Sequence, residues 1–348
     1  MGISDQGGTR TVMTENSQNS QNTQSTGDSE RDPASLHTPV LLERCVELLA
    51  PALQAAGSVY VDATLGMGGH SEAVLDRCPN ARLIGFDRDS EALGLAGRRL
   101  ARFGDRVTLV HAVYDEFDSS LDELGIDTVD AVLFDLGVSS LQLDEASRGF
   151  SYIQDAPLDM RMDATKGVTA AEIVASYGEE ELKQLFYRYG DEKLAPRYAS
   201  WIVRERAQAP IETTGQLVDV LQRATPAAKR DAGHPAKRVF QALRIEVNAE
   251  LGALERALPQ ALNRVAVGGR VVVEAYQSLE DRFVKRLFET KTTSTAPSGL
   301  PVELPEHKPE FERLVRGAER AGVDEGEINP RALPVRLRAV ARVRSPRA

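Results

Sequence analysis

Between residues 59 and 135, short apolar runs alternate with segments of helical periodicity, and this alternation is the feature that most constrains the fold. The runs that predict strands are residues 59–61, 82–86, 107–110 and 131–134. Helical spacing of apolar residues follows the first and the second run. Strand, helix and strand repeated at these distances predict a parallel sheet with helices on both faces, which is a doubly wound α/β fold.

The pattern changes after Leu141. From 142 to 240 apolar residues recur at helical spacing without a strand pattern, which predicts an inserted all-helical domain. Strand patterns return at 270–276 and at 335–341, where arginines and small apolar residues partly alternate, as is typical near a sheet edge. We therefore expect a sheet domain from 35–141 and 241–348, interrupted by a helical substrate-recognition domain at 142–240, with a loop at 291–310.

Composition narrows the class of protein. Residues 1–34 are rich in Ser, Gln and Asn, which predicts a disordered polar tail. The chain has 52 acidic and 42 basic side chains, a balance that argues against indiscriminate coating of nucleic acid but leaves room for a local basic patch. Two cysteines, no signal pattern and no apolar run near the roughly 18–20 residues that span a bilayer predict a cytoplasmic protein without a membrane role.

A glycine-rich turn follows the first strand. Gly66, Gly68 and Gly69 stand between this strand and the next helix, where glycine lets a ligand approach the backbone closely. Read as a dinucleotide fingerprint, the turn has Ser71 in place of the third glycine, so the match is imperfect.

Acidic residues end two further strands. Asp87 ends the second strand, where a carboxylate can accept hydrogen bonds from both ribose hydroxyls, or it caps the following helix together with Asp89. Asp135 ends the fourth strand, at the edge where open α/β sheets bind ligands. A nicotinamide enzyme and an S-adenosylmethionine (SAM) methyltransferase could both use these groups, and the incomplete glycine pattern favours SAM.

A series of motifs closely resembles the bacterial RsmH (MraW) family of ribosomal RNA small-subunit methyltransferases over residues 36–345. The motifs are His37-Thr38-Pro39-Val40, Asp62-Ala63-Thr64-Leu65-Gly66-Met67-Gly68-Gly69-His70, Asp135-Leu136-Gly137-Val138-Ser139-Ser140, Arg148-Gly149-Phe150-Ser151, Pro157-Leu158-Asp159-Met160-Arg161-Met162-Asp163, His234-Pro235-Ala236, Phe240-Gln241-Ala242-Leu243-Arg244-Ile245, Ser278-Leu279-Glu280-Asp281-Arg282 and Asn329-Pro330-Arg331. The resemblance implies a class I SAM methyltransferase that methylates N4 of one cytosine in the decoding region of 16S rRNA, with the 30S subunit as partner.

The resemblance also implies a set of cofactor contacts. These are Gly68, Gly69, His70, Asp87, Tyr114, Asp135 and Gln142. Tyr114 stands where the family has phenylalanine, and Gln277 stands where it often has a histidine that could act as a base. Without the resemblance, His70 is as well explained by helix capping or packing.

The chemistry leaves one assignment open. Cytosine N4 is a poor nucleophile because its lone pair is delocalised, so an acceptor aimed at the amino group would help. Either Asp135 is this catalytic acceptor, or it contacts only the cofactor and a backbone carbonyl accepts. The histidines His37, His111 and His234 have no metal-ligand spacing, so we expect no metal.

RNA binding requires a local positive surface, and two basic runs offer one, although such runs are often only solvated faces. The first run comprises Arg223, Lys229, Arg230, Lys237, Arg238 and Arg244, and the second contains six arginines within the last 18 residues. Phe150 or Tyr152 would stack on a flipped base or pack in the core. The candidate RNA-binding residues are Arg148, Phe150, His234, Lys237 and Arg238. The alternatives are a methyltransferase for another substrate and a non-catalytic ribosome-assembly factor that binds SAM or RNA.

Overall fold

The computed structural model describes residues 39–297 and 304–345, without the side chains of residues 230–232. The expected polar tail at 1–34 and His37-Thr38 lie outside the described residues, as does the 298–303 part of the expected loop. The chain divides into two compact units, one with Leu136 and Arg256 at its internal borders and one spanning Gly137–Glu255. The two are described separately below.

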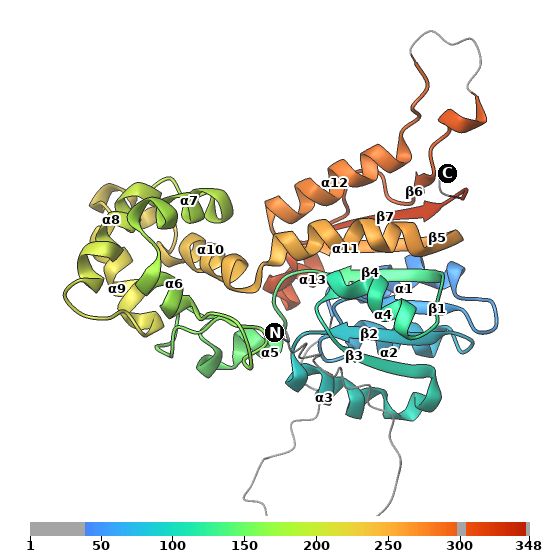
Figure 1. Cartoon of the computed structure of the whole chain (residues 1–348), viewed down its shortest axis with the longest axis horizontal. Helices are drawn as coiled ribbons and strands as arrows, with labels where there is room; N and C mark the ends of the chain where they lie inside the picture. Colours follow the sequence, from blue (N-terminus) through green and yellow to red (C-terminus); the bar gives the residue numbers. More distant parts are fainter. Residues whose placement is uncertain (1–38, 298–303, 346–348) are drawn as a thin grey trace, which may run out of the picture. The chain divides into compact units, whose positions relative to one another are not determined.

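The first unit contains a seven-stranded sheet in the order β3-β2-β1-β4-β5-β7-β6 (Figure 1). Its strands are β1 (Val59–Asp62), β2 (Arg82–Asp87), β3 (Val107–His111), β4 (Val129–Asp135), β5 (Val265–Ala275), β6 (Phe311–Arg313) and β7 (Arg336–Arg342). The five strands β1 to β5 pair in parallel, as expected from the alternation of strands and helices. The doubly wound α/β fold is therefore confirmed.

Two features of the sheet differ from the expectation. Strand β7 runs antiparallel to β5 and β6, so the sheet is mixed rather than parallel. Between β6 and β7 the chain passes through α13 (Val323–Ile328) and returns, so that β7 lies between β5 and β6 and runs antiparallel to both. Three residues with one apolar side chain are too short a signal for β6 to stand out in the sequence.

Helices cover both faces of this sheet. The helices of the unit are α1 (Leu42–Leu49), α2 (Gly69–Arg77), α3 (Ser90–Leu100), α4 (Phe117–Glu123), α12 (Ser278–Thr292) and α13 (Val323–Ile328), together with α11 (Glu250–Arg264), which contains the border between the units. Apolar residues of α1, α2 and α3 pack with alternate residues of the central strands, including Tyr60, Leu133 and Val272. On the opposite face Phe117 of α4 stacks on Phe86. The period of two along each strand thus decides which side chains meet α1 and α2.

The second unit is helical, and residues 137–255 as described contain no strand. Its helices are α5 (Ser140–Asp144), α6 (Ala170–Ser176), α7 (Glu179–Gly190), α8 (Ala195–Arg206), α9 (Thr214–Ala224) and α10 (Ala236–Asn248). Its own apolar core includes Phe186, Ile202, Leu221 and Leu243, all fully or almost fully buried. Capping boxes begin α6 at Thr169 and α9 at Thr213, which fixes both helix starts.

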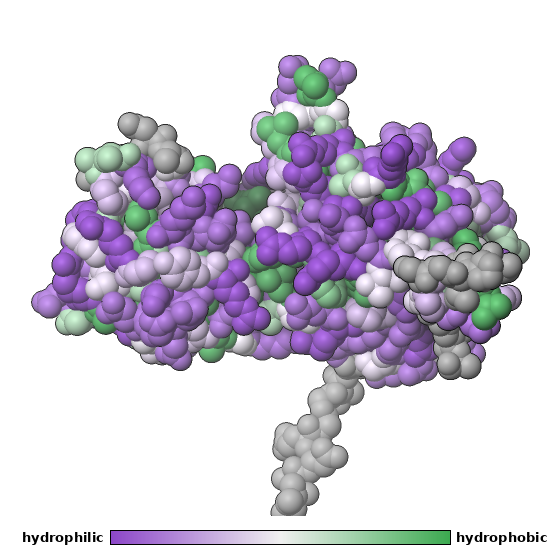
Figure 2. Space-filling view, turned by 90° about the horizontal axis from the view of Figure 1, so that it is seen from above, coloured by the Kyte–Doolittle hydropathy of each residue, from purple (hydrophilic) through white to green (hydrophobic). Residues whose placement is uncertain are grey.

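No helix in the described part of the chain is long and apolar enough to cross a membrane. The face seen in Figure 2 is mostly hydrophilic, with hydrophobic residues in small separate patches.

Candidate functional site

The glycine turn leads from β1 to α2 and lies against the end of β2. Gly66 and Gly68 have φ values of 53° and 78°, a region that L side chains rarely adopt. The N–H of Gly66 donates to Asp87 Oδ2 at 2.7 Å. A Cβ on Gly69 would lie 2.5 Å from Cγ of Pro39, so this position also needs glycine. The turn therefore holds its backbone against the end of β2.

Asp87 is positioned by two backbone donors. Besides Gly66, the N–H of Asp89 donates to Asp87 Oδ1 at 2.8 Å. The side chain of Asp89 caps α3 by accepting from the N–H groups of Glu91 and Ala92, whereas Asp87 does not cap the helix. Burial raises the pKa of Asp87 to about 6, against the two N–H donors, which lower it. The half-buried Asp87 is thus a fixed acceptor at the carboxyl end of β2.

Tyr114 lies after β3, in the 3-10 turn Tyr114–Glu116. Its ring meets Phe134 of β4 edge to face, with ring centroids 5.8 Å apart. A tyrosine ring is as wide and as flat as the phenylalanine that the resemblance leads us to expect, so the aromatic surface is kept.

Asp135 ends β4 with its backbone and side chain fixed. Its N–H donates to Thr64 Oγ1 at 2.6 Å, which ties the end of β4 to the residues after β1. The side chain is 29% exposed and lies 3.7 Å from Nδ1 of His70. Tyr276 hydrogen-bonds Asp135, and burial followed by the charge of Asp135 raises the pKa of that phenol.

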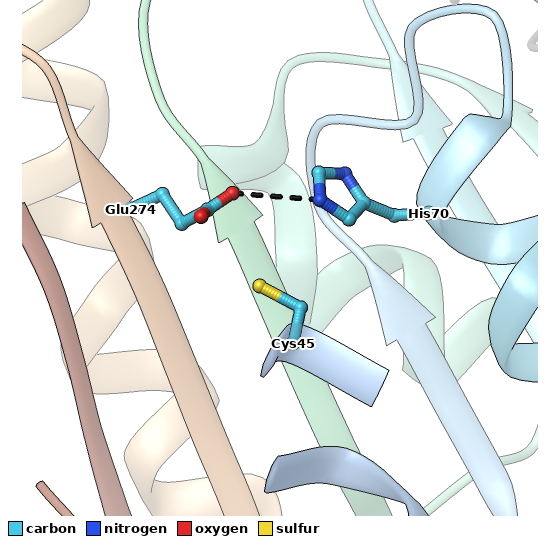
Figure 3. Close-up of side chains that lie close together, drawn as sticks. All are labelled: Cys45, His70 and Glu274. Carbon is cyan, nitrogen blue, oxygen red and sulfur yellow. Dashed lines mark ion pairs between the residues drawn. The ribbon is translucent and has the colours of Figure 1, made fainter. Parts of the chain in front are cut away.

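The side chain of His70 points into the protein, in line with the packing alternative. The ring is 6% exposed, and its Nε2 lies 2.9 Å from the carbonyl oxygen of Val40. The same nitrogen lies 3.5 Å from Glu274 Oε2 (Figure 3). Both ring nitrogens therefore face oxygens, Asp135 on one side and Val40 with Glu274 on the other.

Glu274 of β5 was not expected from the sequence. It is fully buried, and its register partner across the strands is Asp135. Burial, and secondly the charge of Asp135, raises the pKa of Glu274 well above its ordinary value. One signal was available: a carboxylate inside the run Val271-Val272-Val273-Glu274-Ala275 needs a special reason to be there.

Cys45, His70 and Glu274 offer three atoms within 4.8 Å of one another, a grouping that raises the question of a metal ion (Figure 3). Sulfur, nitrogen and oxygen ligands of this kind suit zinc. The His70 nitrogen nearest Glu274 already lies at hydrogen-bond distance from Val40, so its lone pair is not directed at an ion. The three side chains fit a proton-sharing network better than a metal centre, and the expectation of no metal stays a prediction.

Gln142, the remaining expected cofactor contact, belongs to the helical unit. It is buried at the start of α5, where its Oε1 accepts from the N–H of Ser139 and its own N–H donates to Ser139 Oγ. This capping box fixes the turn that follows Gly137.

The candidate RNA-binding residues lie in the helical unit too. Arg148 donates to the carbonyl oxygens of Arg161 and Met162, and so ties its own motif to the Asp-Met-Arg-Met-Asp run. Phe150 is 7% exposed and packs in the helical core, which favours the packing alternative for this ring. His234 is exposed and stacks on Tyr152, with ring centroids 4.5 Å apart.

The first basic run is only partly available to a ligand. Arg223 pairs with Glu205, and Arg244 forms two hydrogen bonds to Glu250, so these cations are engaged within the protein. Lys237 and Arg238 at the start of α10 are exposed, and Arg238 also donates to the carbonyl oxygen of Asp191. His234 and Arg223 also line an open cavity of about 560 Å³ with Gln222, Thr225, Gly233 and Pro235.

Gln277 has a structural partner at the position where relatives often have histidine. It caps α12, since Glu280 accepts from both its backbone N–H and its side-chain Nε2. Glutamine lacks a basic nitrogen, so no proton acceptor stands at this position.

Comparison with known proteins identifies the family of the chain. The model of the MraW methylase family matches residues 34–343. The chain is 68% identical over 309 residues to ribosomal RNA small subunit methyltransferase H of Clavibacter michiganensis, covering 89% of this chain and 97% of that protein. The proteins of the same name from Leifsonia xyli (89% of this chain, 95% of that protein) and Streptomyces avermitilis (89% and 98%) are 65% and 56% identical. The chain therefore belongs to the MraW methylase family.

Proposed function

We propose that this protein transfers a methyl group from SAM to N4 of a specific cytosine in the decoding region of bacterial 16S rRNA. The observation that carries the proposal is the match to proteins named ribosomal RNA small subunit methyltransferase H at 56–68% identity, over most of this chain and of those relatives. The choice of N4 and of the decoding region is supported by the motif series of the sequence analysis.

The residues of the sheet unit fit the methyl donor. The Asp87 carboxylate is held by two N–H donors and keeps lone pairs for the ribose hydroxyls. The turn at Gly68 and Gly69 gives close access to the backbone, and Tyr114 offers an aromatic face for the adenine. His70, buried behind the glycine turn, and Gln142 of the helical unit remain proposed contacts that rest on the resemblance. The donor supplies an electrophilic methyl group on a sulfonium, and the chain's residues supply its position.

Asp135 is the proposed catalytic residue. Its backbone is fixed by Thr64 and its carboxylate remains partly exposed at the sheet edge. An acceptor there would orient the amino group, favour the geometry in which the nitrogen lone pair is available, and receive a proton as charge develops. Holding nitrogen, methyl carbon and sulfur in line would supply most of the remaining acceleration.

The helical unit, residues 137–255, is the proposed substrate-recognition part. Lys237 and Arg238 are exposed cations suited to phosphate contact, and Arg148, Phe150 and His234 belong to motifs that the resemblance assigns to this family. A paired cytosine cannot reach the donor, so the target base must be unpaired or flipped. The proposed localisation is the cytoplasm, and the proposed partner is 16S rRNA in the 30S subunit.

The experiment offers purified 30S subunits from a strain lacking the enzyme, free 16S rRNA and DNA as substrates, with radiolabelled SAM. The label is mapped by nuclease digestion and mass spectrometry. Label on N4 of one decoding-region cytosine is the expected result. Label on DNA or protein would favour a methyltransferase for another substrate, and SAM binding without any transfer would favour a non-catalytic assembly factor.

A further inference from the structure

Glu274 is an unusual residue for the interior of a sheet, on strand β5 between β4 and β7. It is 0% exposed, and among the described residues no N–H or O–H group donates a hydrogen bond to its carboxyl oxygens, which leaves the weak thiol donor of Cys45 beside them. An ionised carboxylate in such a place costs several kcal/mol unless it is paired. The surroundings of Glu274 therefore favour the neutral acid as long as no positive charge is brought near it.

The sheet register places Glu274 next to the catalytic candidate. Asp135 and Glu274 are partners across β4 and β5, and both side chains point to the face covered by α1 and α2. The ring of His70 connects them, with Nδ1 3.7 Å from Asp135 Oδ2 and Nε2 3.5 Å from Glu274 Oε2. A buried line of three titratable groups thus begins at the partly exposed end of β4 and ends inside the protein.

Every other titratable group facing Glu274 is acidic or weakly acidic. These groups are Cys45 on α1, Asp62 on β1, Asp135 on β4, Tyr276 after β5 and Glu325 on α13. His70 is the one group facing Glu274, in the described part of the chain, that can carry a positive charge. With several acids and one imidazole, the number of protons in this cluster responds to any charge brought to Asp135.

We propose that Asp135, His70 and Glu274 form a proton store coupled to the charge of the cofactor, which holds about one proton fewer beside a sulfonium than beside a thioether. The inference rests on the proposed function, because it requires SAM at the carboxyl ends of the strands. Glu274 is the deepest member and acts through His70, so it is a positioning residue rather than a catalytic one.

The proton balance of the reaction shows what the store would do during methyl transfer. Methyl transfer breaks the carbon–sulfur bond, forms a carbon–nitrogen bond and leaves the electron pair on sulfur, so one positive charge disappears from the cofactor. The amino group releases one proton, first to Asp135 and then along His70 to Glu274. Charge lost by the cofactor is replaced by a proton gained by the cluster, and the total charge of the buried site stays constant.

Isothermal titration calorimetry measures this coupling directly. The full chain is titrated with SAM and with S-adenosylhomocysteine at the same pH, in two buffers of different ionisation enthalpy, and the protons exchanged are taken from the heats. Both ligands carry the same ribose, so any proton change at Asp87 cancels in the difference. We expect SAM to release about one proton more than S-adenosylhomocysteine, and this difference to fade at high pH, where the store is already empty. Equal proton numbers for the two ligands at every pH would overturn the proposal.

The Glu274→Gln variant tests whether Glu274 holds the proton that differs between the two ligands. Glutamine has the shape of the neutral acid but cannot ionise, so the variant should bind both ligands and lose most of the difference. The control is Glu310→Gln, a nearly buried glutamate of the same unit that pairs with Lys291 and should keep the difference. Thermal unfolding checks that both variants fold, and His70→Gln, which should also reduce the difference, is the second variant on the line.

The outcomes separate this inference from the function. SAM binding without a proton difference would refute the proton store but not the proposed methyltransferase activity. Absence of SAM binding to the wild-type chain would refute both the proton store and the proposed activity. A stoichiometric zinc ion that is present in the wild-type protein and lost from Glu274→Gln would overturn the store, since the three side chains would then be metal ligands.

Discussion

Replacing Asp87 by asparagine should weaken SAM binding by a predictable amount. Each carboxylate oxygen of Asp87 already accepts one backbone N–H, from Gly66 and Asp89, and each has a lone pair left for one ribose hydroxyl. Asparagine is neutral and keeps one of these oxygens, so one hydroxyl loses its acceptor and the other keeps an uncharged one. Such a hydrogen bond contributes about 1.5–3 kcal/mol, which corresponds to roughly a 10- to 150-fold rise in Kd.

The pH dependence follows from the same carboxylate. Burial raises the pKa of Asp87 to about 6, and ribose hydroxyls form stronger hydrogen bonds to the ionised carboxylate than to the neutral acid. The affinity for S-adenosylhomocysteine, which has the same ribose but no sulfonium, should therefore be constant well above pH 6 and fall by up to about tenfold per pH unit below it. The stability of the cofactor-free protein changes with pH in the opposite direction. Because folding raises the pKa of Asp87 from 3.8 to about 6, the contribution of this group to the free energy of unfolding falls as the pH rises through that range.

Calorimetric titration with S-adenosylhomocysteine over this pH range, and with SAM at one pH for the variant, is the assay. Asp89→Asn is the matched control, since Asp89 caps α3 and its replacement should leave Kd within about twofold. An Asp87→Asn variant that binds SAM like the control, together with a wild-type affinity for S-adenosylhomocysteine that does not change through pH 6, would refute the role of Asp87 in holding the ribose.

Four further outcomes are expected. Asp135→Asn should lower kcat by about 10²–10⁴-fold while Kd for SAM, measured by calorimetry, changes only a few-fold; near-normal turnover would show that the carboxylate is dispensable. Neutralising Lys237 and Arg238 together should reduce the slope of log K for RNA against log salt by about 2 in filter binding, whereas an unchanged slope would place the phosphate contacts elsewhere. Gly149→Ala should lower the free energy of unfolding by at least about 1–3 kcal/mol, because φ is +70° and the new Cβ would lie 2.2 Å from the carbonyl oxygen of Pro157; an unchanged denaturant midpoint would contradict this. Exhaustive treatment with a chelator should leave methyl transfer unaltered, and recovery of lost activity by added zinc would contradict the absence of a required metal.

The sheet could be predicted largely because its signals are local. The runs that end in Asp62, Asp87 and Asp135 are apolar, and a parallel sheet brings their carboxyl ends to one edge. Strand β6 and the direction of β7 depend instead on pairing between distant segments, which a single sequence does not display.

The side-chain network of the site is less predictable for the same reason. The register that pairs Asp135 with Glu274 joins residues far apart in the chain. Arg244 was expected in the basic patch, but Ala249 adopts φ 49° after α10 and turns the chain so that Glu250 meets the guanidinium. Such a left-handed alanine gives no sequence signal, because glycine or asparagine is the usual residue there.

The position of β7 has a consequence for synthesis of the protein on the ribosome. This strand is the last of the seven along the chain, yet it lies between β5 and β6. Until it emerges, the β5 edge has no partner, and an unpaired apolar edge invites association with other nascent chains. A message truncated before codon 336 would thus yield a protein with every proposed catalytic residue and a permanently open sheet, and such a product should depend on chaperones or be degraded.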